Sequence, residues 1–278
     1  MAKTKSDEPK TGETTGDRTL TFGGVWAYAP APESTDHFTI APRHELFVGG
    51  EFRKPKTGEY FATINPATEA VLSEVALAGE KDVDAAVQAA TKAFPAWRKL
   101  SGEDRARYLF RIARILLERA REFACLETLD NGKPIKETRD VDVPLAAQHF
   151  FYHAGWADKL DLLFPGERPE PLGVIGQVIP WNFPLLMAAW KIAPALAAGN
   201  TVVLKPAETS PLTALRLCEV FQQAGLPPGV VNVITGDGKT GQALVRHPGL
   251  AKVAFTGSTE GGKEIQRAVA GQGVELTL

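Results

Sequence analysis

The sequence predicts an α/β protein in which a parallel sheet carries helices on both faces, preceded by a mainly helical segment. Over residues 173–278, short apolar strand candidates alternate with helix candidates. Before residue 173, apolar residues recur mostly at helical spacing. Five strands that alternate with four helices imply parallel pairing, because each helix returns the chain across a face of the sheet.

Residues 1–43 are expected to form a disordered tail followed by an extended arm. Residues 1–18 are mostly Lys, Glu, Asp, Thr and Gly, with little to bury and no apolar signal core. Residues 19–43 are rich in Pro, Thr and Ala.

Residues 44–143 are predicted to begin with two short strands, 46–52 and 60–68, separated by turn residues. From Asp82 the apolar spacing becomes helical. Ser101 and Asp104 have capping-box spacing, so a second helix starts there. Its expected buried face is Leu109, Ile112, Leu116 and Phe123, and "LDNGKP" (129–134) ends or interrupts it. A further helix is expected over 143–160.

The region 173–278 holds the regular alternation. The predicted strands are 174–179, 201–204, 230–234, 252–255 and 274–278. The predicted helices are 184–198, 211–224, 240–247 and 259–270. Pro184 and Pro211 lie where a first helical turn tolerates proline, and "AGN" and "AGLPPG" are typical helix ends.

Ligands of such sheets bind beyond the carboxyl ends of the strands. The segments that follow the strands are therefore the candidates: "PWN", "KPAE", "TGDGKTG" and "TGSTEGG". In "VVLKPAE", Lys205 and Glu208 follow a buried strand, where a carboxylate can accept the hydroxyls of a ribose. Taken alone, the same pair could be two solvated loop charges.

Two glycine patterns could bind phosphate. "GDGKTG" (236–241) matches a dinucleotide fingerprint, but the next strand does not end in an acidic residue, so a plain glycine turn stays open. "GSTEGGK" (257–263) has P-loop spacing, yet Glu264 replaces the Ser or Thr that would hold magnesium, which disfavours an NTPase. A helix starting near Ser258 can still bind a pyrophosphate through backbone N–H groups, or be an ordinary capped helix.

In combination, several segments resemble the N-terminal half of an NAD(P)-dependent aldehyde dehydrogenase. They include "INPATEAVLSEVALAGEKDVDAAVQAATKAF", "AGWADK", "GVIGQVIPWNFPLLM", "AAGNTVVLKPAETSPLTAL", "GLPPGVVNVITGDG" and "KVAFTGSTEGGK". The resemblance implies a Rossmann-like NAD(P)-binding segment over 173–278 and a helical part of the cofactor domain over 44–143. Residues 144–172 correspond to a helix and an oligomerisation hairpin, shortened here at "LDLLFPGERPEPLG".

The resemblance also implies site residues. The Asn182 carboxamide is expected to donate to the aldehyde oxygen and stabilise its developing charge; without the resemblance, Asn182 could instead cap the helix at Pro184. The implied cofactor-binding residues are Ile179, Pro180, Trp181, Lys205, Glu208, Gly238, Phe255, Thr256, Gly257 and Ser258. Glu208 favours NAD over NADP, because a 2′-phosphate would meet a like charge, although NADP remains possible.

The family's chemistry needs a cysteine nucleophile and a glutamate general base, which in the family follow the segment that matches "VELTL". Cys125 and Cys218 lie mid-helix among apolar residues and are expected to be inert. We therefore expect a fragment without activity alone, with an aldehyde as the substrate of the full-length enzyme. A catalytic-half partner chain or a homo-oligomer is possible. The alternative is a non-catalytic module that binds a dinucleotide or pairs with a relative.

The composition limits the classes of partner and the cellular compartment that we expect. A net charge of −2 argues against a nucleic-acid or membrane-surface role, because both usually need a basic excess. Two cysteines cannot form a disulfide framework, which favours the cytoplasm.

Overall fold

The computed structural model describes residues 34–163, 165–166 and 169–278. The expected disordered tail and the first part of the arm lie outside the described residues.

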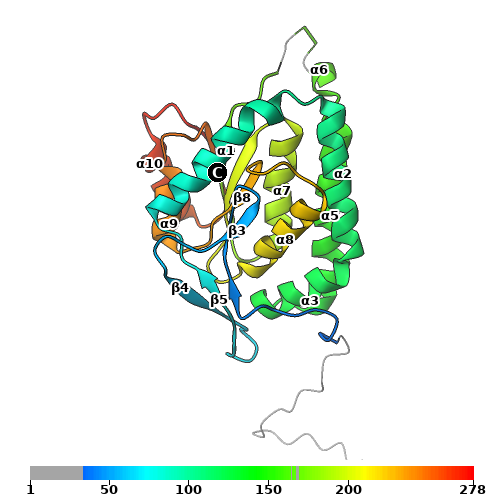
Figure 1. Cartoon of the computed structure of the whole chain (residues 1–278), viewed down its shortest axis with the longest axis vertical. Coiled ribbons are helices and arrows are strands. Elements are labelled where there is room, and N and C mark those ends of the chain that lie inside the picture. Colours follow the sequence, from blue (N-terminus) through cyan, green and yellow to red (C-terminus); the bar gives the residue numbers. More distant parts are fainter. Residues whose placement is uncertain (1–33, 164, 167–168) are drawn as a thin grey trace, which may run out of the picture. The chain divides into compact units, whose positions relative to one another are not determined.

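A seven-stranded sheet forms the centre of the described region (Figure 1), and its strands lie in the order β10-β9-β6-β7-β8-β2-β3. Five strands run parallel, as predicted: β6 (Val174–Val178), β7 (Thr201–Lys205), β8 (Val231–Val233), β9 (Lys252–Phe255) and β10 (Glu275–Thr277). The two central strands, β6 and β7, are almost entirely buried, which is why they read as continuous apolar runs.

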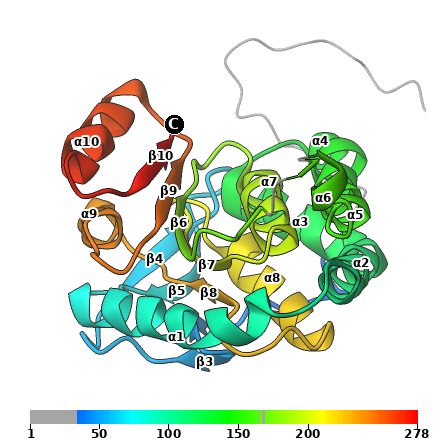
Figure 2. The same cartoon turned by 90° about the horizontal axis from the view of Figure 1, so that it is seen from above.

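Helices cover both faces of this sheet (Figure 2). On one face, α1 (Glu80–Arg98) packs on β7 and contacts α9 (Gly238–Val245), which in turn contacts α10 (Thr259–Val269). The other face carries α7 (Pro184–Ala197) and α8 (Leu212–Gln223). The predicted Rossmann-like α/β class is therefore confirmed, as are these four helices of the C-terminal half.

A second layer of helices packs beyond α7 and α8. It consists of α2 (Gly102–Glu118), α3 (Ala120–Asn131) and α5 (Val143–Trp156). As predicted, α2 begins at Ser101, whose hydroxyl accepts from Asp104 N at 3.0 Å. Its predicted buried residues are buried, but α2 ends at Glu118, so Phe123 belongs to α3. Gly132, at φ 82°, ends α3 in the left-handed region.

The connection from α3 to α5 is short, and after residues 132–134 it is helical. It comprises α4 (Ile135–Glu137) and one π-helical turn (Thr138–Asp142). The helix predicted over 143–160 ends earlier, at Trp156, and α6 (Leu160–Leu163) is separate. In the part of the chain that the structure describes, every helix is too short or too polar to cross a bilayer.

The N-terminal strands differ from the prediction. Residues 46–52 form a hairpin, β2 (Leu46–Val48) and β3 (Glu51–Arg53), because Gly49 and Gly50 both have positive φ, 67° and 87°. Residues 60–68 form a strand only up to Ile64, as β4 (Tyr60–Ile64). The small sheet β1-β5-β4 also contains β1 (Arg43–His44) and β5 (Val71–Ala76), which the sequence did not predict.

Candidate functional site

The strand register brings the predicted site segments to one edge. Val178, at the end of β6, lies opposite Lys205 on β7 and Phe255 on β9. The loops that follow these three strands therefore begin side by side. This is the edge where parallel α/β sheets bind ligands.

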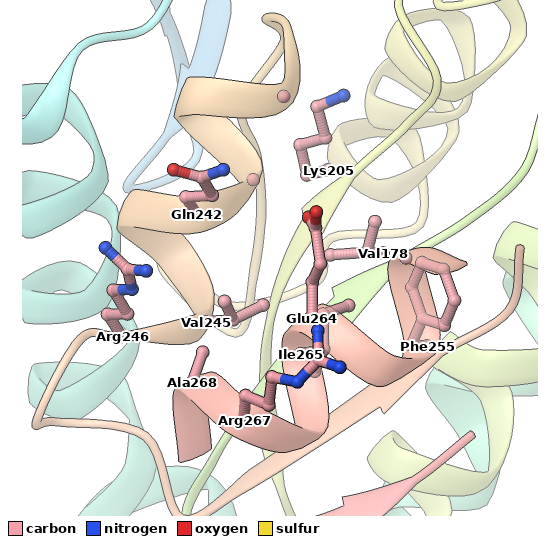
Figure 3. Close-up of a pocket in the computed structure, with 13 residues that line it drawn as sticks. Val178, Lys205, Gln242, Val245, Arg246, Phe255, Glu264, Ile265, Arg267 and Ala268 are labelled. Carbon is pink, nitrogen blue, oxygen red and sulfur yellow. The ribbon is translucent and has the colours of Figure 1, made fainter. Parts of the chain in front are cut away.

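A cavity of about 460 Å³ lies between α9 and α10 at this edge (Figure 3). Of the predicted residues, Lys205, Gly238 and Phe255 line it. Its apolar lining is completed by Val178, Val245, Ile265 and Ala268. Trp181 and Glu208 instead line a neighbouring cavity of about 540 Å³, together with Asp130 and Asn131.

Lys205 and Glu208 form an ion pair between the two cavities. Lys205 is only 5% exposed, and its Nζ lies 3.0 Å from Glu208 Oε2. The Glu208 side chain is 51% exposed. Burial opposes ionisation of this carboxyl, but its own backbone N–H and the Lys205 ammonium outweigh burial and hold the Glu208 pKa below its usual range. The alternative of two solvated charges is therefore wrong for Lys205, whereas about half of the Glu208 side chain is exposed to solvent.

The N-terminus of α9 is occupied by a carboxylate of the chain itself. Asp237 accepts from Lys239 N at 2.8 Å and from Thr240 N at 3.2 Å. An anion therefore meets a like charge there, and "GDGKTG" serves as a capped turn. Gly238 and Gly241 have open space where a Cβ would be, and both line the α9–α10 cavity.

The N-terminus of α10 is capped by a hydroxyl, not by a carboxylate. Ser258 Oγ caps it by accepting from Gly261 N at 3.1 Å, which leaves the hydroxyl proton free to donate. The Phe255 ring lies against Gly257, where an added Cβ would stand 2.5 Å from Cζ. Thr256 N donates to Val178 O at 3.1 Å, so this turn is fixed to β6.

Asn182 lies on an exposed loop between two prolines. Its side chain has no hydrogen-bond partner among the described residues. The residue before α7 is Phe183, and neither its side chain nor that of Asn182 caps the helix. The cap considered from sequence is therefore not formed. Before it, Ile179 is buried and its N–H donates to Lys205 O at 3.2 Å, whereas Trp181 is 61% exposed.

Contacts from the C-terminal end of α3 and from the segment before α8 hold this loop. Asn131 Nδ2 donates to Trp181 O, and Ser210 Oγ donates to the same oxygen at 3.3 Å. The Lys133 ammonium lies 3.4 Å from the centre of the Phe183 ring. The peptide next to Asn182 is thus fixed on both sides.

Two buried carboxylates of α3 cap the helices that follow the loop. Glu127 Oε2 accepts from Leu185 N at 3.2 Å, at the start of α7. Asp130 Oδ2 accepts from Leu212 N at 2.8 Å, at the start of α8, and its Oδ1 accepts from Thr63 Oγ1 at 2.7 Å. Sequence reasoning missed both residues, although three-residue spacing places them on one face of the helix.

Burial has a large effect on the acidity of these groups. It raises the pKa of Glu127 to about 8, with a further contribution from nearby Asp142. It also raises the pKa of Asp130 to about 7, although Thr63 and the Leu212 N–H oppose this. On α7, burial lowers the pKa of Lys191 to about 8.

Neither cysteine lies at the edge. Both are buried, and burial raises the pKa of the Cys218 thiol. Its Sγ–H donates to Ala214 O at 3.3 Å, within α8. Such a thiol is a poor nucleophile, because the thiolate is the reactive form.

Comparisons with known proteins show what this chain is similar to. The model of the "Aldehyde dehydrogenase family" matches residues 52–278. An aldehyde dehydrogenase of Alternaria alternata is 49% identical over 240 residues, 83% of this chain and 48% of that protein. Aldehyde dehydrogenase B of Escherichia coli is 48% identical over 248 residues, 86% of this chain and 48% of that protein.

Solved structures agree. The NAD+ complex of an aldehyde dehydrogenase from Bacillus cereus has a TM-score of 0.82 and 44% identity, covering 85% of this chain and 50% of that one. The chain thus spans about half the length of the relatives it matches. The resemblance inferred from the sequence motifs is confirmed.

Proposed function

Because the chain belongs to the aldehyde dehydrogenase family, we propose that it carries the dinucleotide half of a site for the NAD-dependent oxidation of aldehydes to carboxylic acids. The observation that supports this most is the pairing of Lys205 and Glu208 beside the α9–α10 cavity. A carboxylate with a free face, next to an apolar cavity at the ligand edge, suits the ribose and base of a dinucleotide.

The residues present fit NAD. The cavity, which Gly238, Gly241 and Phe255 line, would hold the base, since the two glycines leave room there. Glu208 would accept the ribose hydroxyls. Thr256, Gly257 and Ser258 at the start of α10 would hold the pyrophosphate. Ile179, Pro180 and Trp181 are the remaining residues that would contact the cofactor.

We propose that the site prefers NAD to NADP. A 2′-phosphate would meet the Glu208 carboxylate, whose lowered pKa keeps it charged at neutral pH. Lys205 cannot offset this repulsion fully, since its ammonium is already paired with Glu208.

At the other end of the site, Asn182 donates its amide to the aldehyde oxygen and stabilises the negative charge that develops there. Its unpaired amide and the fixed Trp181 carbonyl suit this role, because a preorganised donor needs no reorganisation during the reaction. Bound NAD supplies the acceptor for the hydride.

We propose that the chain alone does not oxidise aldehydes. The nucleophile that the family's chemistry needs must be an accessible thiolate, and Cys125 and Cys218 are both buried. Activity would then require either a partner chain that carries the catalytic half or a homo-oligomer. The alternative is a module that binds the dinucleotide without catalysis. A reducing cytoplasm suits two buried cysteines.

The cofactor proposal is tested by calorimetric titration of the 278-residue chain with NAD and with NADP. We expect NAD to bind at least about tenfold more tightly. Glu208→Gln removes the repulsion, so it should bring the two affinities closer, whereas exposed Glu59→Gln should leave the ratio unchanged. Heat from neither dinucleotide, with an unshifted melting temperature, would contradict the site.

Inactivity is tested on the same protein with NAD and a panel of aldehydes, following absorbance of the reduced cofactor. No turnover above the blank is expected. A thioester-forming aldehyde probe should label neither cysteine. Stoichiometric labelling of Cys218 or Cys125, or sustained turnover, would refute this part of the proposal.

A further inference from the structure

The cavity between α9 and α10 has a polar rim that binding of ribose and pyrophosphate leaves unused. Gln242 and Arg246 come from α9, and Glu264 and Arg267 come from α10 (Figure 3). Among the described residues, none of these four side chains has a hydrogen-bond or ion-pair partner. Four such groups at the mouth of a largely apolar cavity suggest polar recognition of whatever enters it.

Glu264 is the best placed of the four. Its neighbour Ile265 is buried and forms part of the floor. Figure 3 shows the Glu264 carboxylate directed from α10 into the cavity, toward the part in which Lys205 lies. Lys205 is held by Glu208, and within the described part of the chain no cation lies within ion-pair distance of Glu264. A carboxylate that can only accept hydrogen bonds therefore faces the space above an apolar floor.

A purine base fits this arrangement in one chemical form. Its ring is apolar on both faces and can pack on Val178, Val245 and Ile265. The edge of adenine carries an exocyclic amine, a donor, next to a ring nitrogen that accepts. A 6-oxopurine carries an oxygen at the same position. A carboxylate accepts from the amine and is repelled by the oxygen.

The geometry points to Glu264 as the residue that selects the base, an inference that rests on the proposed dinucleotide site. Its carboxylate accepts a hydrogen bond from the C6 amine of adenine. Gln242, on the opposite wall, offers both a donor and an acceptor to the rest of the base edge. The cavity thus takes an adenine dinucleotide and discriminates against its 6-oxopurine analogue.

The test compares NAD with nicotinamide hypoxanthine dinucleotide, which differs at the C6 position of the purine and the adjacent N1 proton. Both are titrated calorimetrically into the 278-residue chain, into Glu264→Ala and into Glu260→Gln. Glu260 lies one turn earlier on the same helix and does not line the cavity, so it is the matched control. The conservative Glu264→Gln keeps an acceptor oxygen but removes the charge.

We expect the wild-type chain to bind NAD about tenfold more tightly than the hypoxanthine dinucleotide. Glu264→Ala should lower this ratio to about two, chiefly by weakening NAD binding, and Glu264→Gln should give an intermediate ratio. Glu260→Gln should retain the wild-type ratio.

Two results would overturn the assignment. Equal affinities in the wild-type chain, or a ratio that Glu264→Ala leaves unchanged, would remove Glu264 from base selection while the dinucleotide site stands. Heat from neither dinucleotide in the wild-type chain would refute the site itself, and the inference with it.

Discussion

The two sides of the candidate site are built differently. On the carbonyl side, the loop over residues 179–183 is held by Asn131 and Ser210 and is flanked by helices that buried carboxylates cap. On the nucleotide side, the α9–α10 cavity is lined by apolar side chains and exposed polar ones, and its helices are capped locally by Asp237 and Ser258.

The difference follows from what each side must do. An amide that stabilises a developing charge has to be fixed before the reaction, and buried, hydrogen-bonded acidic groups give that fixity at a cost in stability. A cavity that takes a base needs shape and a few accessible polar groups. Changes to the buried groups that support the carbonyl side should therefore alter folding stability, and changes on the nucleotide side should alter binding.

The largest effect is expected from Asp130→Ala. It removes the acceptor for Leu212 N and Thr63 Oγ1, leaving two polar groups unpaired where they are buried. We expect a loss of about 3 kcal/mol in the free energy of unfolding. Urea unfolding measures it, with exposed Asp140→Ala as the control. Equal small losses in both variants would contradict a supporting role for Asp130.

Glu127 should make stability depend on pH. Its folded pKa of about 8 lies above the unfolded value, so its contribution is present below the unfolded pKa, near 4.5. It is lost as the pH rises toward 8. Glu127→Gln cannot ionise, so its unfolding free energy should decline less, by about 2 kcal/mol between roughly pH 5 and pH 6.5. If the free energy of unfolding fell equally with pH in the wild-type chain and in Glu127→Gln, ionisation of Glu127 would not be the cause of the pH dependence.

Lys191 should make the free energy of unfolding depend on pH in the opposite direction. Its folded pKa of about 8 lies below the unfolded 10.5, so the folded state is penalised at neutral pH and recovers as the pH rises from 8 to 10.5. Because solvent partly screens the ammonium, we expect Lys191→Met to stabilise the chain at pH 7 by only about 1 kcal/mol. Thermal unfolding measures the change, with the exposed Lys136→Met as the control. If both variants were stabilised, the gain would come from replacing any lysine by methionine and not from the burial of Lys191.

The smallest effect on stability is expected from Asn182→Ala. The side chain is exposed and caps no helix. The free energy of unfolding should stay within about 0.5 kcal/mol of wild type, and NAD affinity should also be unchanged. A loss of about 1 kcal/mol or more would show that the amide has a structural role after all.

The sequence predicts the regular part of this fold well, because the central strands are apolar runs and their helices are bounded by Ser101, Pro184 and similar signals. It predicts the hairpin at Gly49 and Gly50 poorly, since a short apolar run with two glycines resembles a single strand. The sequence also fails to predict the strand β5, because its polar Ser73 breaks the apolar pattern. In the fold, tertiary contacts bury this side chain.

The support of the site is harder to predict. Glu127 and Asp130 look like an ordinary polar helix face, and only the packing of α7 and α8 on α3 makes them caps. In the sequence, Glu264 is informative only because it stands where a P-loop would have Ser or Thr. Its position at the cavity depends on how α10 packs against α9.

The most direct test of this account is hydrogen–deuterium exchange of the 278-residue chain with and without saturating NAD. The amides of α9, α10 and the turn at Ser258 should gain protection on binding. Those of Leu185 and Leu212, held by buried carboxylates, should exchange slowly in both states. Unchanged exchange across α9 and α10 at saturating NAD would contradict the claim that this chain forms a dinucleotide site.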